Sequence, residues 1–176
     1  MRVQDYLIVE ARLKDEMKNL DGVLARLTRL GLYPEIATAA VGGFPLTDEN
    51  AARIVGSYLQ DFYNCFENMA KVVARSIDGA GQPQGPDWHS ELLRQMSTPV
   101  RGIRPRLISE ETWRTLDEYR RFRYVFRNVY GFVLDAGRTT ELLRQLPEAA
   151  AGLKRDLAGF MDEMSRALDI PSPGLG

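Results

Sequence analysis

The sequence is poor in the residues that form cross-links and metal sites. Its 176 residues include one cysteine and one histidine, which excludes an internal disulfide and a cysteine-rich zinc site. Cys65 lies in an apolar helical run, where we expect a buried thiol. His89 has no cysteine or acid at ligand spacing, so it is a poor metal site. No glycine-rich phosphate loop follows a strand, and the sequence therefore predicts no metal and no cofactor.

Long apolar runs and strand-like alternation are also missing. No segment is long and apolar enough to predict a transmembrane helix, and the N-terminus opens with Arg2, Gln4 and Asp5 rather than with a signal peptide. Apolar residues make up 44% of the chain and charged residues 27%, as in ordinary globular proteins. We therefore expect a cytoplasmic protein with no membrane association. Its length predicts one domain over residues 1–168 and a flexible tail over 169–176.

Helical periodicity dominates the sequence. Apolar residues recur at gaps of three and four, which is typical of helices with one buried face. The predicted helices cover residues 4–30, 47–78, 88–96, 109–133 and 140–168. Thr47, Asp87 and Ser109 are suitable N-caps, and Pro147 predicts a kink or break in the last helix. The predicted fold class is an all-α, up-and-down bundle of four long helices plus a short one.

Lysine is scarce and arginine is clustered. The chain has only four lysines, and its formal net charge is −1. The window from position 101 to 127 contains only four acids but eight arginines. These arginines are Arg101, Arg104, Arg106, Arg114, Arg120, Arg121, Arg123 and Arg127. A local positive excess on a nearly neutral protein favours a defined anionic ligand. The alternative is that arginine is simply the preferred surface cation, with the arginines of the 97–108 connector keeping that loop hydrated.

The densest part of this cluster is the segment 120–132. Arg120, Arg123 and Arg127 recur there at helical spacing, beside Tyr130 and away from the apolar face. Each guanidinium offers planar, bidentate hydrogen bonding, which suits it to binding phosphate.

This segment resembles the active-site helix of the HEPN superfamily, in particular that of HepT-like ribonuclease toxins. In these proteins an arginine is followed by four residues, a histidine, one residue and a tyrosine. Arg123 and Tyr130 match the first and last positions, and Asn128 stands where the histidine is expected. The neighbouring Phe122 and the pair Gly131-Phe132 extend the likeness, and a weaker resemblance covers residues 48–164.

The resemblance implies a homodimeric, metal-independent RNA endonuclease of a toxin–antitoxin system. Arg123 would stabilise the phosphate charge, and Arg120, Arg127 and Tyr124 would bind the RNA. The implied partner is an antitoxin, a nucleotidyltransferase of the minimal (MNT) type, which attaches AMP to the tyrosine of the motif. Tyr130 would then be the modification acceptor; the alternative is an unmodified tyrosine in the cleft.

Asn128 is the most informative departure from the family pattern. An amide cannot transfer protons near neutral pH, and general acid–base catalysis contributes roughly 100- to 10,000-fold. We therefore expect a weak or inactive enzyme. Three explanations remain open: a natural pseudo-enzyme that binds RNA, an engineered inactive variant, or a subfamily that uses Tyr124, Tyr130 or His89 instead. For His89 we favour a packing role, because catalysis requires the fold to carry it next to Arg123.

Two other functions are compatible with the sequence. One is a non-catalytic helical module whose basic face binds RNA or an acidic protein. The other is a structural bundle whose arginines are solvated surface residues. Salt-sensitive binding separates the first of these from the second, and turnover separates both from a nuclease.

Overall fold

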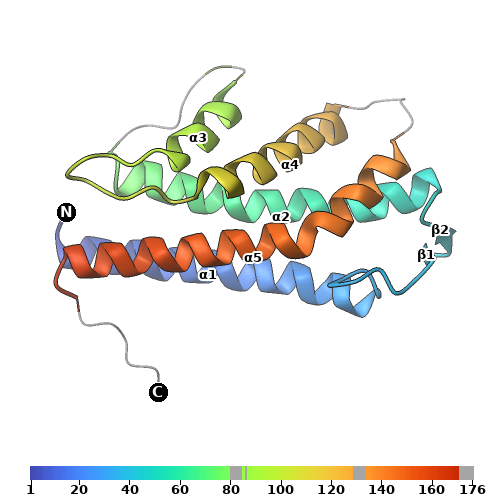
Figure 1. Cartoon of the computed structure of the whole chain (residues 1–176), viewed down its shortest axis with the longest axis horizontal. Coiled ribbons are helices and arrows are strands. Elements are labelled where there is room, and N and C mark those ends of the chain that lie inside the picture. The colour runs from blue at the N-terminus through green and yellow to red at the C-terminus, as the bar shows by residue number, and fades with distance from the viewer. Residues whose placement is uncertain (80–84, 86, 129–133, 171–176) are drawn as a thin grey trace.

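The computed structural model describes residues 1–79, 85, 87–128 and 134–170. Within these ranges, the chain forms five helices and one short hairpin: α1 (Val3–Arg29), β1 (Ala40–Val41), β2 (Phe44–Pro45), α2 (Glu49–Ser76), α3 (Trp88–Ser97), α4 (Glu110–Asn128) and α5 (Ala136–Ala167). The long helices alternate in direction (Figure 1). The predicted all-α, up-and-down bundle of four long helices and a short one is therefore confirmed. None of the described helices is long and apolar enough to cross a bilayer.

Helix α2 lies at the centre of the molecule. It packs against each of the other four helices, with α3 and α4 above it in Figure 1 and α1 and α5 below. This position follows from its sequence, because buried side chains occupy most of its circumference, including Leu59, Phe62, Tyr63, Phe66 and Met69. An apolar stripe this wide is buried only when several other elements cover it.

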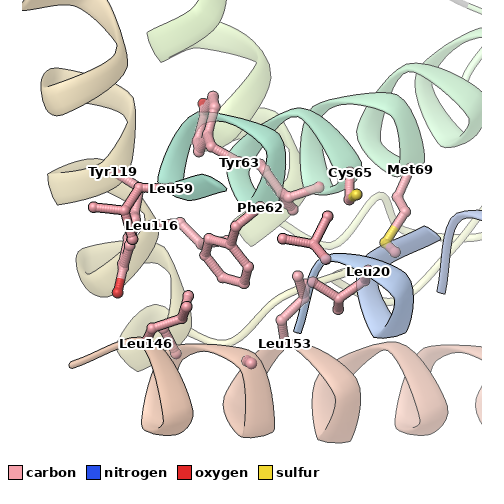
Figure 2. Packing of buried hydrophobic residues seen from close by; sticks show 14 of the residues in the cluster. Leu20, Leu59, Phe62, Tyr63, Cys65, Met69, Leu116, Tyr119, Leu146 and Leu153 are labelled. Carbon is pink, nitrogen blue, oxygen red and sulfur yellow. The ribbon is translucent and has the colours of Figure 1, made fainter. Parts of the chain in front are cut away.

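Side chains from four helices meet around Phe62 of α2 (Figure 2). Its ring packs edge-on against Tyr119 of α4, with centroids 4.9 Å apart. The buried hydroxyl of Tyr119 donates to the carbonyl of Leu142 in α5 at 2.9 Å, so this polar group has a hydrogen-bond partner inside the core. Cys65 lies in the same core, where burial raises the pKa of its thiol to about 11. This confirms the predicted buried thiol.

The last helix begins earlier than the sequence pattern suggested. We predicted a turn up to residue 140, but α5 starts at Ala136 because Asp135 caps it, accepting from the Arg138 amide at 3.1 Å. Pro147 lies inside α5 without breaking it. In Figure 1 the orange first part of α5 is inclined to the red remainder, as expected for a helix that contains a proline.

The loop before α2 contains a small hairpin, which corrects the expectation of a chain without strands. Val41 pairs with Phe44, and Gly42 and Gly43 make the turn with φ values of 60° and 84°. Two successive positive φ angles are the requirement of a tight hairpin turn, and glycine meets it without strain. The N-cap of α2 is Asp48 rather than the predicted Thr47, because the Asp48 carboxylate accepts from a backbone amide at 2.7 Å.

The remaining cap predictions have mixed outcomes. Ser109 caps α4 as expected, since its hydroxyl accepts from the Thr112 amide at 3.2 Å. Asp87 occupies the N-cap position of α3, but its side chain makes no capping hydrogen bond to any described residue.

The connector between α3 and α4 is held by a buried ion pair. Arg104, expected to be a solvated or phosphate-binding residue, is fully buried and contacts Asp78 just beyond α2, with Nε 2.6 Å from Oδ1. The same guanidinium donates to the carbonyl oxygens of Gln95, Thr98 and Pro105. Arg104 is therefore a structural residue and is removed from the candidate anion-binding set.

Candidate functional site

A cluster of polar side chains lies where α2, α3 and α4 meet. At its centre is Glu67 of α2, which is only 4% exposed although it carries a carboxylate. One of its oxygens lies 2.5 Å from Nζ of Lys71, and the other lies 2.6 Å from Nδ1 of His89 in α3. The second oxygen is also 3.7 Å from Nη2 of Arg123 in α4. A buried carboxylate is stable here because it has three partners.

Arg123, the arginine of the predicted motif, points into this cluster. Its Nε donates to Oδ1 of Asn64 at 3.2 Å, and its Nη1 lies 3.1 Å from Nε2 of His89. The side chain is 9% exposed, so its direction is fixed by packing and by these contacts. A guanidinium has five N–H donors, and these partners leave some of them for a ligand.

His89 is the residue whose position the sequence did not predict. The fold carries it next to Arg123, the position that a catalytic role requires. Its ring lies against Trp88, with ring centroids 3.5 Å apart, and Nζ of Lys71 lies 4.9 Å from the Trp88 ring centre. Burial lowers the pKa of His89 from its ordinary value, and Arg123 lowers it further, while Glu67 acts in the opposite direction. We therefore expect a neutral imidazole at pH 7.

A cavity of about 600 Å³ opens beside this cluster. Its described lining comes mainly from α3 and α4: Gly85, Asp87, Trp88, His89, Ser90, Arg120, Arg123, Tyr124 and Arg127. The three arginines predicted to share a helix face do line one pocket. Tyr124 is 67% exposed at its rim. The cavity presents cationic and aromatic groups together, a combination that suits phosphate and nucleobases.

Acids offset part of the arginine cluster. Asp117 contacts both Arg120 at 2.7 Å and Arg121 at 2.8 Å, and Arg114 pairs with Glu110 on the outer surface. Arg127 is exposed and makes no hydrogen bond or ion pair with another described residue. Arg127 is therefore the pocket arginine most available to an anion.

Part of the predicted motif lies beyond the described residues. Asn128 is the last described residue of α4, and its side chain is not described. Tyr130, Gly131 and Phe132 lie outside the described residues.

Glu67 and its neighbours could have been identified from the sequence. Asn64, Glu67 and Lys71 recur at gaps of three and four and form one polar stripe of α2, which also carries polar residues such as Arg53, Ser57 and Asn68. Such a stripe must face either solvent or polar groups of other elements. Nothing local in the sequence links this stripe to His89, because that contact depends on how the connector places α3.

A model of the HepT-like protein family matches residues 54–164. This range is more than half of the chain and contains every residue of the polar cluster. No curated protein and no solved structure matches the chain.

Proposed function

The chain belongs to the HepT-like protein family, and from this premise we propose that it is a metal-independent RNA endonuclease with low activity. The observation that carries the proposal is that Arg120, Arg123 and Arg127 line one pocket together with the imidazole of His89. Cleavage of RNA requires stabilisation of the extra negative charge that develops on phosphorus. A fixed, largely buried guanidinium such as Arg123 supports that role, because it needs no reorganisation during the reaction.

The exposed members of the pocket would bind the RNA strand. Arg127 would hold a neighbouring phosphate, and Arg120 would contribute more weakly because Asp117 already neutralises part of its charge. Tyr124 presents an exposed ring at the rim, where a base can stack on it.

Low activity follows from Asn128. This residue occupies the position of the family's proton-transferring histidine, and an amide cannot take over that role. General acid–base catalysis by a group at this position contributes roughly 100- to 10,000-fold in rate, and Asn128 does not supply it.

We further propose the regulation and assembly that the family resemblance implies. An MNT-type nucleotidyltransferase antitoxin would modify Tyr130 with AMP and so add negative charge to the motif. The homodimer would form across the face that carries the Arg123 segment, where Tyr124 is 67% exposed and Val125 is 50% exposed. Val125 also lines a shallow, mostly apolar depression of about 190 Å³ together with Phe122 and Leu134, which supports burial of this face.

The test is cleavage of a fluorescent RNA by the purified full chain in EDTA. We expect slow cleavage by the chain as given, a roughly 100-fold or greater increase for Asn128→His, and no cleavage for Arg123→Ala. Arg114→Ala is the matched control, because Arg114 lies on the same helix, is exposed and lies outside the pocket. It should cleave at the rate of the unmodified chain.

The alternative function is a non-catalytic RNA- or protein-binding helical module, and Asn128 is the observation that favours it. It is supported if neither the given chain nor Asn128→His cleaves RNA, yet both bind it in a salt-sensitive manner. If the chain neither cleaves nor binds RNA, the proposed nuclease function is wrong.

A further inference from the structure

The contacts of His89 determine which of its ring nitrogens carries the hydrogen. Arginine has N–H donors and no acceptor, so Nε2 of His89 must accept the hydrogen bond from Nη1 of Arg123 across 3.1 Å. The ring hydrogen is then on Nδ1, which donates to Glu67 across 2.6 Å. A protonated ring would place two donors against each other at the Arg123 contact. The site therefore holds a neutral imidazole with its lone pair on Nε2.

This lone pair lies at the wall of the pocket. His89 keeps 21% of its side chain exposed and lines the cavity together with Arg123. A base and a guanidinium in contact match the reacting unit of RNA, in which the 2′-hydroxyl lies beside the phosphate that it attacks. A ligand phosphate that takes over the Arg123 hydrogen bond would leave Nε2 available to the neighbouring hydroxyl.

We propose that His89 is the general base of this chain, in place of the histidine that is absent at Asn128, and that Glu67 is its positioning residue. This inference rests on the proposed RNA endonuclease function. It assigns the low activity proposed above to a base that the family motif does not contain.

The proton and bond changes can be written in full. Nε2 of His89 takes the proton of the 2′-hydroxyl, and the 2′-oxygen forms a bond to phosphorus. The bond from phosphorus to the 5′-oxygen breaks, and water supplies the proton that this oxygen needs. The imidazolium returns its proton to the hydroxide left from that water. The products are a 2′,3′-cyclic phosphate and a 5′-hydroxyl, and Arg123 stabilises the charge on the phosphoryl oxygens throughout.

Other groups near the pocket are less suitable bases. Tyr124 is 67% exposed at the rim of the pocket, outside the buried cluster. Lys71 lies 2.5 Å from Glu67 and against the Trp88 ring, and so it faces the cluster. The charged groups that face His89 are Glu67 and Lys71 from α2 and Arg123 from α4, and the two cations favour its neutral form.

The experiment compares the full chain with His89→Gln, Glu67→Gln, Arg123→Ala and Asn128→His in the EDTA assay, with RNA affinity measured in parallel. Glutamine keeps a similar size and hydrogen bonding but cannot take a proton. We expect His89→Gln to lower kcat at least 100-fold with RNA affinity changed less than twofold. The control Ser97→Ala, at the far end of α3, should keep the original rate. The products should end in a 2′,3′-cyclic phosphate, and a substrate with a 2′-deoxy sugar at the cleavage point should be inert.

A pH profile distinguishes catalysis from packing and does not depend on the folding of any variant. The cleavage rate of the unmodified chain should rise with pH through one ionisation below the ordinary histidine value and then level off. A flat profile in this range overturns the proposal.

The remaining outcomes separate the inference from the function on which it rests. If Arg123→Ala abolishes cleavage while His89→Gln cleaves at the original rate, the role of His89 is wrong and the nuclease function stands. The same conclusion follows if Asn128→His cleaves and the given chain does not. If no version cleaves, both proposals fail.

Discussion

Nε2 of His89 lies 3.1 Å from Nη1 of Arg123, although 34 positions separate the two residues in sequence. Neither side chain is placed by its own helix alone. Glu67 contacts both of them from α2, so one buried carboxylate holds a base from α3 and a cation from α4 against each other. This coupling makes the protonation of His89 a sensitive measure of the whole cluster.

The single histidine makes this protonation directly measurable. In an NMR titration, the only imidazole signal of the chain should report a pKa below the ordinary value of about 6.5. Arg123→Ala should raise this pKa, because it removes a cation that disfavours the charged ring, and Glu67→Gln should lower it further. Equal pKa values in the three proteins would contradict the contacts described here.

The same shift predicts how stability depends on pH. A lowered pKa in the folded state means that the unfolded chain binds the proton first as the pH falls. The contribution of His89 to the free energy of unfolding is therefore complete above the unfolded pKa and is lost as the pH falls through the folded pKa. Between about pH 7 and pH 5, urea unfolding should show that the free energy of unfolding falls more for the unmodified chain than for His89→Gln. If the free energy of unfolding falls equally with pH in the two proteins, this prediction is wrong.

Salt dependence tests the pocket as a phosphate site. Each phosphate contact to single-stranded RNA contributes a slope of about 0.7 in a plot of log affinity against log salt concentration. Arg127→Ala should reduce the slope by about that amount, because Arg127 is exposed and has no described acidic partner. Arg120→Ala should have a smaller effect because Asp117 neutralises it. Arg114→Ala should leave the slope unchanged, and an equal effect from all three would indicate non-specific surface attraction.

The helices could be predicted from the sequence because their signal is local. Apolar spacing of three and four predicted the four long helices, and α5 buries residues at these gaps: Leu146, Ala150, Leu153, Leu157, Phe160 and Met164. The boundaries failed where a single side chain decides them, as Asp135 does for α5 and Asp48 for α2. A capping hydrogen bond is worth only about 1 kcal/mol, so several nearby residues are comparable candidates from sequence alone.

The site was predictable only in part, and for a different reason. Arg120, Arg123 and Arg127 share one helix, and their common pocket follows from spacing. The net charge that each arginine presents to a ligand does not follow from spacing, because Asp117 offsets Arg120 and Glu67 contacts Arg123. Arg104 was expected to be solvated or to bind phosphate, yet it is buried against Asp78. Long-range ion pairs depend on the packing of whole helices, and helical periodicity contains no information about them.

The close approach of α2 and α4 depends on Gly56. A Cβ atom at this position would lie 2.7 Å from the Phe126 ring and 3.2 Å from the Phe122 ring. Gly56→Ala should therefore destabilise the chain by about 1–3 kcal/mol through overpacking, and should displace the helix that contains Arg123. Gly22→Ala in α1 is the matched control, since no described atom lies within 4 Å of its added Cβ. It should instead stabilise the chain by about 0.5–1 kcal/mol, as measured by urea unfolding; similar values for both would contradict the packing.

The buried pair of Arg104 and Asp78 should be the most sensitive point of the connector. Arg104→Met leaves Asp78, which is 6% exposed, without its cation, and removal of one partner of a buried pair costs about 3–5 kcal/mol. Replacing both residues, as Arg104→Met with Asp78→Leu, should recover much of the loss, because no uncompensated charge remains. Arg101→Met, an exposed change in the same connector, should stay within about 0.5 kcal/mol. Urea unfolding of the four proteins decides the matter: a double variant as unstable as Arg104→Met would show that the fit of the guanidinium among its carbonyl partners, rather than its charge, holds the connector.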